Sequence, residues 1–339
     1  MKAYVLHRIN GLSYEEAAQP DCPDGWAIVQ IKAAGVCSSD IPRIFTKGAY
    51  HYPLIPGHEC SGVVVHTANP TDQQWLGKRV GIFPLIPCHT CPQCSLGNYE
   101  MCTHYDYIGS RRDGGFSELA AVPVWNLIEI PASLSYEEAA MLEPLAVALH
   151  AVRRGSIRRG DTVGVIGTGM IGFAAAQWAK RMGASRVCIV GRNQQKRRIA
   201  EQLSGIEYMA ECGNKPVFDA VIEAVGSSAA VGMAMELTQP GGRVVLMGNP
   251  SGTISLKQDA YWQILRKQLH ITGSWNSSYR QTGMSDWSEA CHALAANELC
   301  VKPLISHTFS QSSLEKGLQI MREHTEPYCK ILTLWNENR

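Results

Sequence analysis

The sequence predicts an α/β protein in which a twisted β domain precedes a doubly wound nucleotide-binding fold. Three observations support this prediction. Short β-type runs separated by Gly and Pro fill the chain up to residue 132, strand and helix patterns alternate from Asp161, and a glycine motif lies where the first of those strands meets a helix. A length of 339 residues is enough for two domains.

The first part of the chain is typical of an antiparallel β domain, with apolar runs at 27–35, 61–66, 78–83 and 116–123. A capping box formed by Ser135 and Glu138 then opens a helix. Pro144 interrupts this helix, because a proline disfavours the helical conformation at the residue before it. We therefore expect Glu143 at a break, where its carboxylate can point inward.

From Asp161 onward, near-continuous apolar runs indicate buried parallel strands at 161–167, 186–191, 217–226, 242–248 and 270–275. Helix patterns follow the first two runs, at 168–183 and from Asn193. The segment after Asp286 holds a helix at 287–299 and a strand-like run at 330–335, and it is too short to be a domain. The expected domains are therefore 1–145 plus 283–339 and, between them, 146–282.

The glycine motif G-T-G-M-I-G places Gly167, Gly169 and Gly172 between a predicted strand and a predicted helix. In a Rossmann fold, the first glycine permits the tight turn, the second lets the pyrophosphate approach the backbone, and the third packs the helix on the strand. Met170 and Ile171 then begin the helix, whose N-terminal N–H groups bind phosphate. The motif predicts a dinucleotide cofactor.

Four of the twelve cysteines are clustered with the spacing C-x2-C-x2-C-x7-C: Cys88, Cys91, Cys94 and Cys102. Four thiolates this close can bind one zinc ion tetrahedrally, which makes a closed structural site. An iron–sulfur cluster is the alternative, but the bacterial ferredoxin pattern has a shorter last gap and a following proline. Here Thr103 follows Cys102, so we predict structural zinc.

Composition excludes several other classes of protein. The formal net charge is +1, whereas a nucleic-acid-binding protein usually has a basic excess. The N-terminal residues lack the apolar segment of a secretory signal, and no apolar run approaches the 18 residues of a spanning helix. We expect a cytoplasmic protein without a membrane or nucleic-acid partner. In that compartment, clustered cysteines favour metal binding over disulfides.

Two further motifs, G-V-C-S-S-D at 35–40 and G-H-E at 57–59, complete a resemblance. Together with the cysteine cluster and the glycine motif, they resemble the zinc-dependent medium-chain alcohol and polyol dehydrogenases over essentially the whole chain. The stretches 40–62, 105–119 and 271–275 are similar to the hexitol-phosphate branch of that family. The resemblance implies a GroES-like catalytic domain and a Rossmann cofactor domain.

By this resemblance, Cys37 and His58 are ligands of a catalytic zinc ion, and Glu59 matches a third ligand in the sorbitol-dehydrogenase-like branch. Glu143 matches a glutamate that either binds the metal or holds its water, so the identity of the third ligand stays open. Ser39 matches the hydroxyl that takes the proton of the alcohol. Three protein ligands and one open position are what a catalytic zinc site needs.

One position departs from the family pattern. Many relatives have a histidine three residues after the relay hydroxyl, where this chain has Pro42, so the proton path from Ser39 must differ; His51 is one possible substitute. Arginine has a planar fork of donors that suits phosphate. The expected substrate-side residues are Arg43, Arg111 and Arg112, followed by Trp275 and Asn276 in the stretch that lines the pocket of polyol dehydrogenases.

The resemblance implies an NAD(P)-dependent enzyme with one catalytic and one structural zinc ion per chain. The expected reaction interconverts a secondary alcohol of a polyol or polyol phosphate, galactitol-1-phosphate-like, and the ketose. The alternatives are a zinc dehydrogenase for an aldonate, an amino alcohol or a simple alcohol, and a binding or sensing protein that keeps the cofactor fold. We expect a homodimer or homotetramer.

The second predicted strand of the nucleotide-binding fold, at 186–191, indicates which dinucleotide is preferred. NAD-binding Rossmann folds usually place an acidic residue at the end of this strand, where it binds the ribose hydroxyls. This chain has Gly191 there, and no carboxylate occurs between Ala184 and Ala200. The basic residues that follow are Arg192, Lys196, Arg197 and Arg198. A glycine leaves room for a 2′-phosphate and an arginine can bind it, so we predict NADP rather than NAD.

Overall fold

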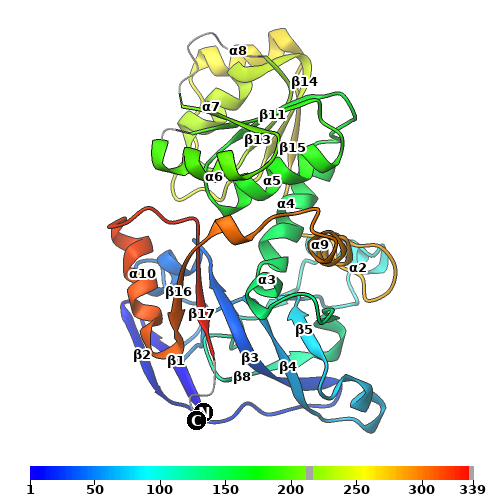
Figure 1. The fold of residues 1–339 in the computed structure, drawn as a ribbon, viewed down its shortest axis with the longest axis vertical. Coiled ribbons are helices and arrows are strands. Elements are labelled where there is room, and N and C mark those ends of the chain that lie inside the picture. The colour runs from blue at the N-terminus through cyan, green and yellow to red at the C-terminus, as the bar shows by residue number, and fades with distance from the viewer. Residues whose placement is uncertain (192, 211–216, 336–339) are drawn as a thin grey trace. The chain divides into compact units, whose positions relative to one another are not determined.

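The computed structural model describes residues 1–191, 193–210 and 217–335 and divides into two compact units (Figure 1). The first unit contains Met1–Glu143, Ser278–Asn297 and Ile305–Arg339, and the second contains Pro144–Ser277 and Glu298–Leu304. We expected all of residues 283–339 in the first domain, whereas Glu298–Leu304 lie in the second unit. The reason is that the Gln177 side chain bonds to both backbone groups of Cys300, at 3.1 and 2.7 Å.

The first unit is built mainly of β-strands. Its strands are β1 (Lys2–Arg8), β2 (Gly11–Glu16), β3 (Trp26–Val36), β4 (Glu59–Thr67), β5 (Arg79–Ile82), β6 (Leu85–Ile86), β7 (Asp106–Tyr107), β8 (Leu119–Pro123), β9 (Leu127–Glu129), β16 (Ile305–Ser310) and β17 (Lys330–Leu334). Its helices are α1 (Asp40–Phe45), α2 (Pro92–Ser95), α3 (Tyr136–Ala140), α9 (Asp286–Ala295) and α10 (Leu314–Glu323).

The main sheet of this unit has the strand order β16-β17-β3-β4-β5-β9, and β8 also pairs with β3. All neighbours are antiparallel except β16 and β17. The segment after Asp286 therefore returns to this sheet, because β17 pairs with β3. Tyr4, Ile31, Phe116 and Ile331 are among the fully buried side chains of its core. The register brings the end of β3 between the starts of β4 and β17.

The second unit is a doubly wound fold, as the apolar runs predict. Its helices are α4 (Leu142–Arg154), of which the first two residues belong to the first unit, α5 (Met170–Arg181), α6 (Arg197–Gln202), α7 (Ser228–Leu237) and α8 (Gln258–Lys267). Its strands are β10 (Thr162–Ile166), β11 (Arg186–Val190), β12 (Ile206–Met209), β13 (Phe218–Glu223), β14 (Thr238–Leu246) and β15 (His270–Gly273).

These six strands are all parallel and have the order β12-β11-β10-β13-β14-β15. This is the strand order of a Rossmann fold, in which the cofactor binds at the carboxyl ends of the strands. In Figure 1, α7 and α8 lie together on one side of the sheet, and α5 and α6 on the other. The last strand is shorter than expected, because it ends at Gly273 and leaves Trp275 in the following loop.

The predicted break before Pro144 is present, although its position differs slightly. The Ser135–Glu138 capping box opens α3, which ends at Ala140, and α4 begins at Leu142. Pro144 lies in the first turn of α4, where its missing N–H removes no hydrogen bond of the helix. Glu143 therefore lies in the first turn of a new helix and is buried.

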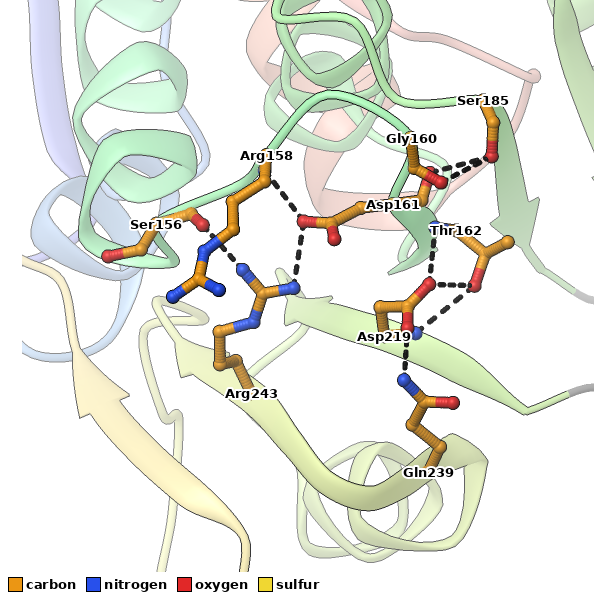
Figure 2. A network of polar contacts seen from close by, with 9 residues as sticks. All are labelled: Ser156, Arg158, Gly160, Asp161, Thr162, Ser185, Asp219, Gln239 and Arg243. Carbon is orange, nitrogen blue, oxygen red and sulfur yellow. Dashed lines mark hydrogen bonds and ion pairs between the residues drawn. The ribbon is translucent and has the colours of Figure 1, made fainter.

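A polar network holds the amino-terminal edge of the six-stranded sheet (Figure 2). Asp219 on β13 accepts hydrogen bonds of 2.7 Å from the backbone N–H and the hydroxyl of Thr162 on β10, and another from Gln239 on β14. Arg243 on β14 donates to Asp161 at 2.7 Å. These contacts connect three neighbouring strands at the end of the sheet opposite the glycine motif. They therefore hold β10, the strand that precedes the glycine loop, in place.

Among the helices that the structure describes, none combines the length and the apolar character that crossing a bilayer would need.

Candidate active site

Cys37, His58 and Glu59 converge because two neighbouring strands bring them to the same end of the main sheet. β3 ends at Val36, just before Cys37, and β4 begins at Glu59, which pairs with Gly35. The potential ligand atoms of the three side chains lie within 4.8 Å of one another. His58 and Glu59 expose only 4% and 1% of their surface. A thiolate, an imidazole and a carboxylate are a donor set that suits zinc and leaves a fourth position open.

The carboxylate of Asp40, at the start of α1, is fully buried and connects two of these candidate ligands. Its Oδ1 lies 3.5 Å from Nδ1 of His58, and its Oδ2 accepts the N–H of Cys37 at 3.0 Å. Burial alone would lower the pKa of His58, but Asp40 and Cys37 raise that pKa well above its ordinary value. A carboxylate placed behind a histidine ligand is a common way to fix the orientation of its ring.

Arg43 also belongs to this arrangement, because its Nη1 donates to Asp40 Oδ1 at 2.7 Å. Only 15% of the Arg43 side chain is exposed. Arg43 is one of the arginines expected on the substrate side, and in this structure its guanidinium faces the buried carboxylate of Asp40. Arg43 therefore contacts Asp40, the carboxylate that lies behind His58.

Glu143 lies near the three candidate ligands, but it is outside the group whose ligand atoms converge. The Tyr107 hydroxyl makes a long contact of 3.5 Å with its Oε1. Burial raises the pKa of Glu143 to about 7, despite the opposing influence of His58. A carboxyl group with this pKa can hold or release a proton near neutral pH. The geometry thus favours Glu59 over Glu143 as the third ligand.

Ser39 is half-buried at the beginning of α1, two residues after Cys37. His51 is exposed, and its two ring nitrogens lie 3.1 Å from the Pro53 carbonyl oxygen and 3.0 Å from that of Arg111. His51 therefore spans two loops through backbone contacts, and nothing in this geometry supports it as the substitute relay.

The four clustered cysteines also converge, with all ligand atoms within 4.8 Å. The Sγ atoms of Cys88 and Cys94 are 4.0 Å apart, as are those of Cys91 and Cys102. Tetrahedral zinc with Zn–S bonds of about 2.3 Å places its sulfurs about 3.8 Å apart, so this arrangement fits the ion.

The polar surroundings of two of these thiols favour the thiolates that zinc requires. The hydroxyl of Thr90, with backbone N–H groups, lowers the pKa of Cys88 to about 7. Backbone N–H groups lower the pKa of Cys91 to about 5. Burial raises the pKa of Cys94 to about 12. Zinc binding therefore has to displace a proton from Cys94.

Of the expected phosphate contacts, Arg111 has the most suitable surroundings. Its guanidinium lies over two tyrosine rings, 4.6 Å from the centroid of Tyr50 and 4.3 Å from that of Tyr105. One of its N–H groups donates to the Tyr105 carbonyl oxygen. Arg112 instead forms an ion pair with Asp106 and lies over the ring of Trp26.

Arg111 is linked to the candidate ligands through a series of rings. The Tyr105 ring contacts the Tyr107 ring, with centroids 6.2 Å apart, and the Tyr107 ring contacts that of His58 at 5.8 Å. Tyr107 is on β7, Tyr105 directly precedes that strand, and this series of ring contacts has Arg111 at one end and His58 at the other.

In the second unit, the glycine motif forms the expected cradle at the start of α5. Gly167 has a φ of 122°, which L side chains rarely adopt. A Cβ on Gly172 would overlap the Gly167 carbonyl oxygen, so the helix packs directly on the turn. A Cβ on Gly169 would meet open space, which leaves the helix N-terminus accessible. The site thus fits a dinucleotide pyrophosphate. Met170 and Ile171 form the first helical turn.

Gly191, at the end of β11, has close neighbours in the space that a side chain would occupy. A Cβ there would overlap the Thr168 methyl group and lie 3.2 Å from the Tyr208 hydroxyl. That hydroxyl donates to the Asn193 carbonyl oxygen at 2.6 Å. An acidic side chain at this position would thus require Thr168 to move.

The basic residues after Gly191 differ in their surroundings. Arg197 is exposed and forms an ion pair of 3.2 Å with Glu201, and Lys196 is half-buried in the turn before α6. Arg192 lies outside the residues that the structure describes. Trp275 is exposed and Asn276 has a φ of 57°, in the loop after β15.

Sequence reasoning missed two buried charged residues at the candidate ligands. Asp40 is the last residue of the G-V-C-S-S-D motif, so its proximity to Cys37 was a usable signal. Lys330 begins β17, and its Nζ lies 2.7 and 2.5 Å from the two carboxylate oxygens of Glu59. The signal for Lys330 was weaker: a lysine that starts an otherwise apolar strand.

Two family models match the chain. The model described as alcohol dehydrogenase GroES-like domain matches residues 23–132, and the model described as zinc-binding dehydrogenase matches residues 171–296. The matches confirm the predicted medium-chain dehydrogenase fold, with a GroES-like and a Rossmann part.

Individual relatives support the same assignment. Galactitol 1-phosphate 5-dehydrogenase of Escherichia coli K12 is 32% identical over 310 residues, which cover 88% of this chain and 90% of that protein. The crystal structure of galactitol-1-phosphate dehydrogenase from Escherichia coli superposes with a TM-score of 0.90 at 31% identity, covering 98% and 100% of the two chains.

Two solved structures with bound cofactors are also similar. A zinc-binding dehydrogenase of Sinorhizobium meliloti 1021, bound to NADP, has a TM-score of 0.88 at 27% identity and 98% coverage of both chains. An alcohol dehydrogenase of Escherichia coli CFT073, complexed with NADH, has a TM-score of 0.88 at 28% identity, covering 98% and 99%.

Proposed function

We propose that the chain, which belongs to the zinc-binding alcohol dehydrogenase family and is an NAD(P)-dependent oxidoreductase, interconverts a secondary alcohol of a hexitol phosphate and the corresponding ketose phosphate. The proposed substrate is similar to galactitol 1-phosphate. The convergence of Cys37, His58 and Glu59 within 4.8 Å is the observation on which the proposal rests.

In this proposal, Cys37, His58 and Glu59 hold the catalytic zinc ion. When bound, zinc polarises the substrate oxygen and lowers the pKa of the alcohol. Ser39 accepts the alcohol proton, and Glu143 holds a proton or a water molecule beside the site. Gly167–Gly172 would hold the pyrophosphate of the cofactor, whose nicotinamide would supply the hydride chemistry.

The phosphate of the substrate is assigned to Arg111. Its flat guanidinium lies over the rings of Tyr50 and Tyr105 and donates to the Tyr105 carbonyl oxygen, which restricts its orientation. An ordered arginine of this kind suits bidentate phosphate binding. Arg43 and Arg112 are each engaged by a carboxylate in this structure.

Replacing Arg111 with glutamine should lower kcat/KM for the hexitol phosphate by roughly 10- to 100-fold, the effect of losing a charged hydrogen bond of about 1.5–3 kcal/mol. The change should appear mainly in KM, and activity on the free hexitol should hardly alter. Arg112→Gln is the matched control. A native enzyme equally active on the free hexitol and its phosphate would contradict the assignment. Higher activity on an aldonate, an amino alcohol or a simple alcohol would favour that alternative substrate.

For the cofactor, we propose that NADP is preferred over NAD. Gly191 provides no carboxylate to repel a 2′-phosphate, and Thr168 occupies the space where an acidic side chain would start. Tyr208 adds a hydroxyl at the same place, and Arg192 is the cationic residue next to it in the sequence.

The test compares kcat/KM for NADP and for NAD in the native enzyme and in Arg192→Ala. We expect the native ratio to favour NADP and the substitution to reduce it by roughly 10- to 100-fold, because a charge-assisted hydrogen bond is lost. Arg198→Ala, an exposed neighbour, should leave the ratio unchanged. A native preference for NAD would refute the proposal.

We also propose that two copies associate through β15. This strand ends the six-stranded sheet, and Ile271 on it is exposed, as are Tyr261, Trp262 and Leu265 on the adjoining α8. An open strand edge beside exposed apolar side chains favours pairing with another chain. Sedimentation should give the mass of a homodimer or homotetramer, and Ile271→Lys should reduce it. A monomeric native protein would refute this arrangement.

A further inference from the structure

Lys330 is a buried lysine whose ammonium group has three oxygen partners. It is the first residue of β17 and exposes 4% of its surface. Its Nζ lies 2.7 Å from Oε1 and 2.5 Å from Oε2 of Glu59, and it donates to the Val36 carbonyl oxygen at 3.2 Å. An ammonium group has three N–H donors, so these contacts can satisfy all of them.

The sheet register explains why two residues so distant in sequence meet. β17 pairs with β3 at Ile331 and Val36, and β3 pairs with β4 at Gly35 and Glu59. Lys330 and Glu59 thus flank the end of β3 from opposite sides. A Cβ on Gly35 would overlap the Glu59 carboxylate, so the glycine provides the space in which the ion pair forms.

The same carboxylate faces the candidate zinc site, because Glu59 belongs to the ligand group with Cys37 and His58. Cys37 and Glu59 carry two negative charges when ionised, which balance one Zn²⁺ ion. Lys330 adds a fixed positive charge to that balance. A zinc ion and the ammonium group would therefore share the electron pairs of one carboxylate, and each would weaken the bond that the other makes.

We propose that Lys330 is a positioning residue that holds Glu59 as a weakened, detachable zinc ligand and thereby sets the zinc affinity of the catalytic site. This inference rests on the proposed function, because it assumes zinc at Cys37, His58 and Glu59. In this proposal, Lys330 contacts neither the substrate nor the cofactor. It controls how firmly one carboxylate can bind the metal.

The test is the zinc affinity of the catalytic site, measured on the full chain by competition with a chromophoric chelator while the four-cysteine site stays loaded. Lys330→Met keeps the length of the side chain and removes its charge. It should lower the Kd for zinc by about tenfold or more, since removing a nearby like charge changes ion binding by one or more powers of ten. Glu59→Gln should raise the Kd.

The double variant separates a direct effect from a structural one. In the Glu59→Gln background, adding Lys330→Met should change the Kd by less than about threefold, because the carboxylate through which the lysine acts is gone. A lysine that only supports the fold would give the same change in both backgrounds, and that result would overturn the proposal.

Cobalt provides a second readout that does not depend on stability. The visible spectrum of Co²⁺ at this site should differ between the native chain and Lys330→Met, because the Glu59–metal bond strengthens. If Lys330→Met is too unstable without metal for equilibrium titration, the release rate of zinc from the loaded variant to excess chelator replaces the Kd. Slower release than in the native chain supports the proposal, and equal or faster release refutes it.

Failure of this inference can be told from failure of the proposed function. If the native chain binds two zinc ions and loses one in Cys37→Ala, the catalytic site exists. A native-like Kd in Lys330→Met then refutes only the role of Lys330. If the native chain binds a single zinc ion and Cys37→Ala leaves that number unchanged, both proposals are wrong.

Discussion

Replacing Cys37 with alanine should lower kcat/KM by about a thousandfold or more and leave the melting temperature within a few degrees of the native value. The rate falls because the site loses a thiolate ligand, and with it a metal that contributes several kcal/mol of transition-state stabilisation. Stability changes little because Cys37 is only half-buried. Metal analysis should show a decrease from two zinc ions per chain to one.

Cys300→Ala is the matched control, since Cys300 is exposed and lies in the second unit. This variant should keep native activity and both zinc ions. A Cys37→Ala enzyme that retains full activity would mean that the reaction does not use this site. Loss of both zinc ions together would mean that the two sites do not have separate roles.

The residues that the sequence identified at this site are those carried by short, local motifs. Cys37 lies in G-V-C-S-S-D and His58 and Glu59 lie in G-H-E, and each motif directly adjoins a strand of the main sheet. The glycine motif is local in the same way, since one strand–turn–helix unit contains all of it. For such residues, chemistry and spacing along the chain are enough to predict that the side chains lie close together.

Residues that act through long-range pairing could not be identified in this way. Lys330 meets Glu59 only because β17 and β4 both flank the end of β3, across 271 positions of sequence. The contact partner of an arginine is equally hard to predict from sequence. Arg43 and Arg111 had the same predicted role, but Arg43 contacts a buried carboxylate, whereas Arg111 lies over two tyrosine rings. These differences arise from packing.

The four-cysteine site should control stability, and Cys94→Ser tests this. We expect the melting temperature to fall by about 10–20 °C, because a loss of roughly 5 kcal/mol of zinc-binding free energy lowers it by about 2–4 °C per kcal/mol in a unit of this size. Zinc content should fall to one ion per chain. Well below the new melting temperature, kcat should stay within a few-fold of native, because this site offers no open position to substrate.

The reason for so large an effect is that the segment around the four cysteines has little other support. It contains an α-helix of four residues, α2, and a 3-10 helix of three residues, Tyr99–Met101, and its buried side chains are largely the sulfurs themselves. Its rings continue into the core of the first unit: His89 and Tyr99 contact Trp125 at 4.9 and 5.0 Å, and Trp125 contacts the buried Tyr279 at 4.9 Å. Losing the metal should therefore loosen that ring cluster too.

A change in tryptophan fluorescence should accompany zinc loss in Cys94→Ser, whereas Cys300→Ser should show neither. An unchanged melting temperature with one zinc ion missing would show that the segment folds without its metal.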